Sequence, residues 1–135
     1  MRSTRLAALL VAGALISSCG GSDGGPSGPT AGVLSLTLNT PNTGDGAVLF
    51  RVNGGVVDSF AGSPMVLDGN YNTFTGNLTR VVVAGPITDG IIGYLFVPDV
   101  SKVGNYTITM EQVVANSNFA QRPVVGYSFA VTVAP

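Results

Sequence analysis

Apolar and polar residues alternate with a period of two along most of the chain beyond residue 31. Successive side chains of a β-strand point to opposite faces, so this period predicts strands that each bury one face. The apolar members of four such runs are Leu34, Leu36 and Leu38; Val48, Phe50 and Val52; Tyr106, Ile108 and Met110; and Tyr127, Phe129, Val131 and Val133. No stretch has the 3.6-residue period of an amphipathic helix, and the pattern therefore predicts an all-β fold.

Two further runs, residues 78–84 and 91–97, are more continuously apolar, which predicts central strands covered on both faces. Asn-Gly and Asp-Gly pairs supply the positive φ that tight hairpins need. The turn signals between the runs are Gly44-Asp45-Gly46, Asn53-Gly54-Gly55, Asp68-Gly69-Asn70, Asp89-Gly90 and Gly104-Asn105. Residues 31–135 are therefore predicted to form one domain, an antiparallel β-sandwich of about seven to nine strands.

The first 18 residues have the three parts of a secretory signal peptide. Arg2 and Arg5 precede an apolar run of eleven residues, 6–16, and the small residues Ser17 and Ser18 follow it. A helix needs roughly 20 apolar residues to cross the hydrocarbon core, so this run is too short for a transmembrane span. We therefore expect residues 1–18 to be a signal peptide.

Cys19 is the only cysteine of the chain, and with Ile16, Ser17 and Ser18 it resembles the lipobox of bacterial lipoprotein signal peptides. The resemblance implies that Cys19 is acylated with fatty acids such as palmitate and becomes the N-terminus of a cell-envelope protein whose partner is the membrane. Gly20 stands where Asp would imply retention at the inner membrane, which favours the outer membrane in a diderm host. The alternative is an ordinary signal peptide with a chance cysteine near the cleavage site.

A tether is predicted after the anchor. Five of the eleven residues 20–30 are glycine and none is large and apolar, so the segment cannot bury enough surface to offset its conformational entropy. We expect residues 19–30 to comprise the lipidated cysteine and a flexible tether that spans on the order of 17–20 Å.

The charge balance argues against nucleic acid as a partner. Only 10% of the residues are charged, and removal of residues 1–18 leaves four basic residues against seven acidic ones, a sum of −3. No basic patch is present to contact phosphates.

The residue types also argue against catalysis. The chain has no histidine, and acylation would occupy the only thiol. A pair of carboxylates could hydrolyse a glycosidic bond, but most aspartates lie in or beside turns, where they are expected to stabilise the turn. Glu111 is predicted to point outward from a strand. We therefore expect no enzyme activity and no cofactor.

Two sets of residues are weak candidates for ligand binding. Asp68, Asn70 and Asn72 place oxygen atoms at positions 1, 3 and 5 of a possible Ca²⁺ loop, but Thr73 and Thr79 replace the Gly and Glu of an EF-hand, so an Asp-Gly turn without metal is the preferred interpretation.

Glycans would need exposed aromatic rings, and the candidates are Tyr71, Phe74 and Phe119, each of which could instead be a rim residue of the core. Phe119 also follows Asn116-Ser117-Asn118 in a polar loop that is expected to join the last two strands and to be the default place for a site.

Several segments resemble cohesin modules, among them the late strand Tyr106–Val114 with the Ala115-Asn116-Ser117 that follows it. Gly46–Val52 is similar to an early strand of those domains, and Val81–Pro86 with Gly90–Val97 is similar to their central pair of strands. The resemblance implies a non-enzymatic sandwich that binds a dockerin partner through one sheet face. Gly104–Thr109 is instead similar to the segment around the tyrosine corner of immunoglobulin-like folds. Either resemblance implies two packed sheets, and fold alone does not assign a function. Together with the lipobox-like residues, the sequence leads us to expect a lipid-anchored protein that mediates protein binding or structural contacts, and a carbohydrate-binding module is the alternative.

Overall fold

The alternating segments form two antiparallel sheets in a computed structural model of the chain, which describes residues 28–64, 73–75 and 78–135. One sheet has the order β3-β6-β1-β9, and the other has the order β4-β5-β2-β7-β8. The 3₁₀ helix η1 (Val100–Asn105) connects β6 to β7. The strands are β1 (Gly32–Asn39), β2 (Asp45–Asn53), β3 (Ser59–Gly62), β4 (Thr73–Thr75), β5 (Leu78–Ile87), β6 (Gly90–Val97), β7 (Thr107–Ala115), β8 (Gln121–Arg122) and β9 (Ser128–Val133).

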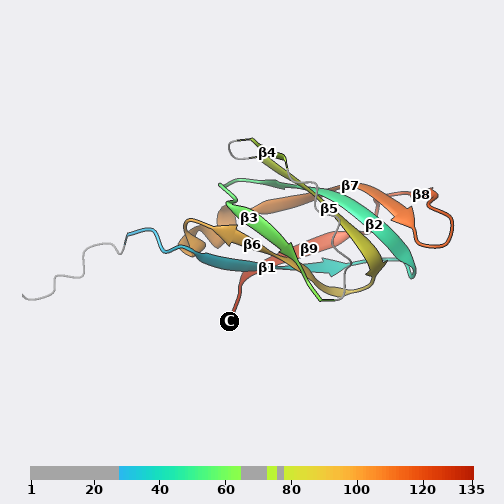
Figure 1. Cartoon of the computed structure of the whole chain (residues 1–135), viewed down its shortest axis with the longest axis horizontal. Coiled ribbons are helices and arrows are strands. Elements are labelled where there is room, and N and C mark those ends of the chain that lie inside the picture. The colour runs from blue at the N-terminus through green and yellow to red at the C-terminus, as the bar shows by residue number, and fades with distance from the viewer. Residues whose placement is uncertain (1–27, 65–72, 76–77) are drawn as a thin grey trace, which may run out of the picture.

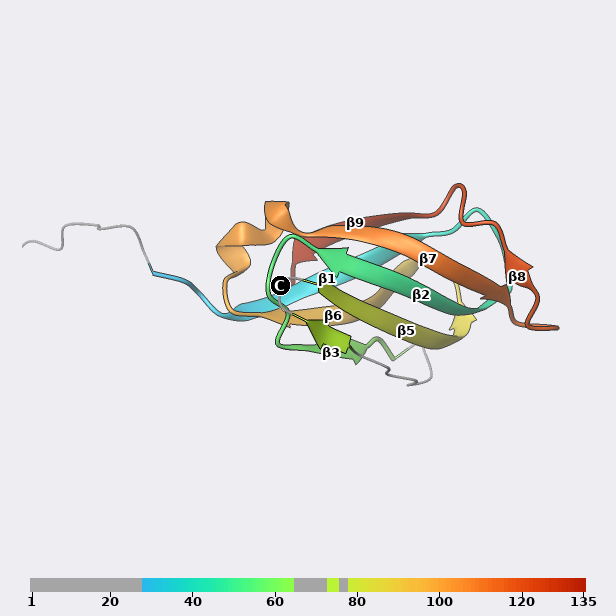
Figure 2. The ribbon, with the colours of Figure 1, turned by 90° about the horizontal axis from the view of Figure 1, so that it is seen from above.

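The two sheets lie one over the other as layers (Figures 1 and 2). Every hydrogen-bonded pair of strands is antiparallel. The predicted all-β sandwich of about seven to nine strands is confirmed.

The core fills the space between the sheets with the side chains that the alternation predicts to face inward. Phe50 of β2 joins the two layers, because its ring centroid lies 6.1 Å from that of Phe60 on β3 and 5.2 Å from that of Phe129 on β9. The predicted inward residues that are fully or almost fully buried are Leu34, Leu36, Leu38, Val48, Phe50 and Val52. Burial of side chains of this size is the main term that stabilises the fold.

The expectation that residues 78–84 and 91–97 are covered on both faces is wrong. Val82 and Ala84 of β5 are only half-buried, and Ile91 and Phe96 of β6 are 38% and 40% exposed. A two-layer sandwich covers only the inner face of each sheet, so the outward apolar residues of these strands form part of the surface.

Four short elements have no counterpart in the sequence pattern. β3, β4 and β8 contain four, three and two residues, and a run of this length cannot show a period of two. The helix η1 contains six residues and has no buried residue that would mark one face. These elements are determined by contacts with the longer strands.

Loops gather at two opposite ends of the sandwich along its long axis (Figure 2). The end at which the chain enters from Gly28, called here the near end, contains η1 and the connection from β2 to β3. The opposite end is the far end. Its connections, called here the far-end loops, are residues 40–44, 88–89, 116–120 and 123–127.

Candidate functional site

The far end is organised around the carboxylate of Asp45, which is fully buried at the start of β2. Its Oδ1 atom accepts a hydrogen bond from Nη1 of Arg122 on β8, at 2.6 Å. Its Oδ2 atom accepts bonds from the hydroxyls of Thr40 at 2.8 Å and Tyr127 at 2.9 Å. A buried charge is costly unless it is paired and hydrogen-bonded, and Asp45 satisfies both conditions.

Further hydrogen bonds tie the far-end loops to one another. Nη1 of Arg122 also donates to the carbonyl of Thr43 at 3.0 Å, and the side-chain amide of Asn42 donates to the Tyr127 hydroxyl at 3.0 Å. The backbone N–H of Asn116 donates to the carbonyl of Gly44 at 2.8 Å. The loop 40–44 is therefore bonded to both of the loops that flank β8.

Gly126 fits closely against the same assembly. Its φ of 90° lies in the left-handed region, and a Cβ at this position would lie 3.1 Å from Cγ of Pro41. The backbone conformation therefore favours glycine, and any other residue would also need Pro41 to move by a few tenths of an ångström.

Phe119 is displayed on a loop with defined geometry. It is 76% exposed, and its φ of 57° makes it the single non-glycine residue with positive φ in the described part of the chain. The loop is closed by bonds from the N–H of Phe119 to the carbonyl of Ala115 at 3.1 Å and from the N–H of Ala115 to the carbonyl of Ala120 at 2.9 Å. A bulky residue in the left-handed region stores strain, and such strain is concentrated at functional sites.

Two valines add apolar surface to the far end. Val125 is 83% exposed and Val124 is 37% exposed in the loop that leads into β9. Together with Phe119 they place exposed apolar side chains on two loops that are each hydrogen-bonded to the loop 40–44. Rigid loops with exposed apolar residues suit the burial of a partner surface, because little conformational entropy is lost on binding.

The near end contains a second polar cluster. Oδ1 of the buried Asp99 accepts bonds from the hydroxyl of Ser101 at 2.6 Å, the N–H of Ser101 at 3.1 Å and the N–H of Thr30 at 3.4 Å. The hydrogen bond from the Ser101 hydroxyl is the main cause that lowers the pKa of Asp99 below its ordinary value of 3.8. Asp99 therefore caps η1 and joins it to the entering chain.

Tyr106, the residue that directly follows η1, completes this cluster. Its hydroxyl donates to the carbonyl of Val56 at 2.7 Å, and burial raises its pKa, with further increases from the charges of Asp58 and Asp99. A lowered carboxyl pKa and a raised phenol pKa leave both groups in their ordinary charge states at neutral pH. Both groups line a hollow of about 290 Å³. Their hydrogen bonds there stabilise the structure, and the two groups do not form an acid–base pair.

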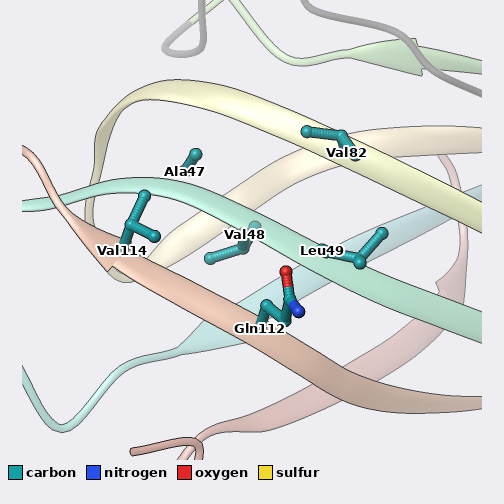
Figure 3. Close-up of a pocket in the computed structure, with 6 residues that line it drawn as sticks. All are labelled: Ala47, Val48, Leu49, Val82, Gln112 and Val114. Carbon is teal, nitrogen blue, oxygen red and sulfur yellow. The ribbon is translucent and has the colours of Figure 1, made fainter. Parts of the chain in front are cut away.

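The outer face of the five-stranded sheet has a shallow hollow of about 140 Å³ (Figure 3). Its lining is apolar except for one amide, and consists of Ala47, Val48, Leu49, Val82, Gln112 and Val114. Ligand pockets usually have volumes of about 300–1,000 Å³. The hollow is therefore too small to enclose an ordinary small-molecule ligand.

Glu111 lies on the same outer face, as the alternation predicts. Its carboxylate accepts bonds from Nε of Arg80 at 3.0 Å and from Nη2 of Arg80 at 3.3 Å, and it lies 3.5 Å from Nε of Arg51. One carboxylate thus pairs with two arginines, which leaves this cluster with one net positive charge. The described residues contain no group of three or more metal-ligating side chains.

The predicted site residues fall into three groups. Cys19, Asp68, Asn70, Tyr71 and Asn72 lie outside the described residues, so neither the anchor nor the Ca²⁺ candidates are tested.

For Phe74 the backbone position alone is described. It lies on β4 opposite Thr79, at the Val52 end of the sheet. Phe119 follows Ala115, which lies opposite Asp45 at the other end. The structure therefore does not bring these two aromatic candidates together.

The third group is the loop that contains Phe119. Its position on the surface is as predicted, and with three-quarters of its area exposed Phe119 is not a rim residue of the core. The loop joins β7 to β8 rather than the last two strands. β8 has only two residues, so no alternation in the sequence predicts it.

The sequence pattern does not identify Asp45, Arg122 and Tyr127 as partners in one site. Asp45 stands between two glycines and was expected to stabilise a turn, but it is the first residue of β2 and is fully buried. Its partners are 77 and 82 residues away in the sequence. A lone acidic residue beside an alternating strand is the one local signal that could have indicated a buried partner.

No protein family model, curated protein or solved structure matches this chain. The resemblances to lipoprotein, cohesin and immunoglobulin-like sequences accordingly stay predictions. Within the ranges that the structure describes, no helix has the length and apolar character needed to cross a membrane.

The Asp45 network can be tested by removing its counter-charge. We expect Arg122→Ala to lower the free energy of unfolding by about 2–4 kcal/mol, because the buried carboxylate loses its ion pair while some water can enter beside the partly exposed arginine position. Urea denaturation at pH 7 measures this change. The matched control is Arg80→Ala, which removes a half-exposed pair and should cost less than about 1 kcal/mol. Equal losses in the two variants would contradict the assigned role of Asp45.

The near-end cluster makes stability depend on pH. Because the native pKa of Asp99 is lowered, its contribution to stability is complete well above the unfolded value of 3.8 and is lost as pH falls through the native pKa. The difference in urea midpoint between the natural chain and Asp99→Asn should therefore be largest at neutral pH and shrink below about pH 4. Ser101→Ala should reproduce part of the effect. A difference that widens with falling pH would refute this account.

Proposed function

We propose that this protein is a non-enzymatic, lipid-anchored protein of the cell envelope that binds a protein partner through the far-end loops. The observation that carries the proposal is the exposure of Phe119 and Val125 on two loops that are both bonded to the loop 40–44, which contributes Thr40 to the buried Asp45 network. The lipobox-like residues that end at Cys19 support the anchor.

The position of the far end also supports this function. The described chain enters at Gly28 on the near end, so an anchor that precedes it would leave the far-end loops farthest from the attachment point (Figure 1). Aromatic residues are enriched in protein interfaces, and charged residues are depleted at their centres. Phe119, Val124 and Val125 match that composition.

A carbohydrate-binding module is the second candidate, and the exposure of the Phe119 ring favours it. A planar ring that is 76% exposed could stack against a sugar. The two candidates differ in their dependence on Val125, because a protein partner would bury both side chains whereas a stacked sugar would need only the ring.

Site-specific photo-crosslinking in cells tests the partner. A photoreactive residue at position 125 of the full chain should yield a discrete protein adduct, whereas one at position 96, which is exposed on the outer face of β6, should not. Phe119→Ala should reduce the adduct at position 125 by at least about tenfold, as loss of an aromatic anchor does.

Two outcomes would contradict the protein partner. One is equal labelling at positions 96 and 125. The other is retention of the purified full chain on a polysaccharide that Phe119→Ala abolishes and Val125→Ala leaves unchanged, which would support the carbohydrate candidate instead.

The anchor has an independent test. We expect Cys19→Ala to abolish incorporation of labelled palmitate and to release the protein from the membrane fraction, because stable anchoring needs the acyl chains on this residue. Ser27→Ala in the tether is the matched control and should remain with the membranes. A Cys19→Ala protein that stays in the membrane fraction would show that another segment holds it there.

A further inference from the structure

β9 has an unpaired edge. It is the outer strand of the four-stranded sheet and pairs with β1 alone. The N–H of Ala134 donates to the carbonyl of Val33. The backbone N–H and C=O groups of every second residue before it, namely Ser128, Ala130 and Thr132, therefore also point toward β1. The N–H and C=O groups of Phe129, Val131 and Val133 therefore point away from β1.

The other edges differ from β9 in length or in sequence. β8 contains two residues, carries Arg122 and is followed by Pro123, and β3 and β4 contain four and three residues. β8 pairs only with Val113 and Val114 of β7, and β4 pairs only with Leu78–Arg80 of β5, so parts of β7 and β5 also have no described partner strand on that side. The unpaired part of β7 carries the charge of Glu111, and that of β5 contains Pro86. Short strands, charges and prolines are the devices by which native sheets avoid pairing with other chains.

β9 carries none of these protections. It has six residues, Ser-Phe-Ala-Val-Thr-Val, with no charge and no proline, and its register with β1 has no bulge. Ser128, Ala130 and Thr132 are small and exposed, so no large side chain covers the outer surface of the strand. An unprotected edge of this length is a template for another strand.

We propose that β9 pairs in antiparallel orientation with β9 of a second copy of this chain. The free groups are centred on Val131, so a two-fold axis there places Val131 opposite its own copy and Phe129 opposite the second copy's Val133. These are all hydrogen-bonded positions, each pair exchanging two bonds, and they would give about six bonds between the copies.

A second copy fits this edge for two reasons. The free groups are self-complementary about Val131, as an isologous two-fold contact requires. The strand is also uncharged, so the pairing of identical strands brings no like charges together: Ala130 lies opposite the second copy's Thr132. The two four-stranded sheets would then form one continuous sheet of eight strands.

Charge placement tests the pairing at two exposed positions. In the natural chain we expect a dimer whose population rises with protein concentration, measured by analytical ultracentrifugation of the full chain in detergent. Ala130→Lys combined with Thr132→Lys places lysines opposite each other twice and should weaken the dimer on the order of tenfold. Ala130→Lys combined with Thr132→Glu places opposite charges there and should restore it.

Disulfide formation tests the register. In membranes from cells that express the full chain, Ala130→Cys combined with Thr132→Cys should form a disulfide-linked dimer under mild oxidation, because the paired Cα atoms are about 4.5–5.5 Å apart. Ala130→Cys alone should not, because its two copies would be diagonal neighbours at roughly 7–8 Å.

Three outcomes would overturn the proposal. The natural chain could remain monomeric at all concentrations, the two lysine-containing variants could dimerise equally, or the cysteines could link β9 to a different protein. The last result would assign the edge to a strand of another partner.

Discussion

The burial of a single carboxylate determines the geometry of the far end. Asp45 has no exposed surface, and its two oxygen atoms accept hydrogen bonds from Thr40 and Tyr127, in two different connections between strands, and from Arg122 on β8. Each of these connections must take a defined path for the charge to be satisfied, because an unpaired buried carboxylate would cost several kcal/mol. The paths of the loops 40–44 and 123–127 thus depend on one electrostatic requirement in addition to their own turn propensities.

The core and the far end of the domain are therefore held by different interactions. The inner faces of the sheets provide stability through packed apolar side chains such as Phe50, which contacts both layers. The far end can then expose Phe119 in a strained backbone conformation, because the surrounding bonds hold it in place. The outer face of the five-stranded sheet carries ion-paired charges and a hollow of about 140 Å³. It offers fewer groups for stability or binding than the core or the far end does.

The sequence predicts the features that repeat locally. A period of two identifies β1, β2, β7 and β9, since each spans at least three alternating positions. It cannot identify β8, which has two residues, or the pairing of Asp45 with Arg122, which joins residues 77 positions apart. The same limit applies to the site. Phe119 could be proposed from its polar loop, whereas the bond from Asn116 to Gly44 joins this loop to a distant part of the chain, and no local pattern encodes it.

The position of β1 has a mechanical consequence. β1 lies between β6 and β9, and the chain that enters it is clamped at Thr30 by bonds to Val100 and Asp99. A force that pulled on the N-terminal segment while the far end was held would act along β1, parallel to the strands. Both ladders of β1 would then be loaded in shear, so that their hydrogen bonds resist together instead of opening one after another.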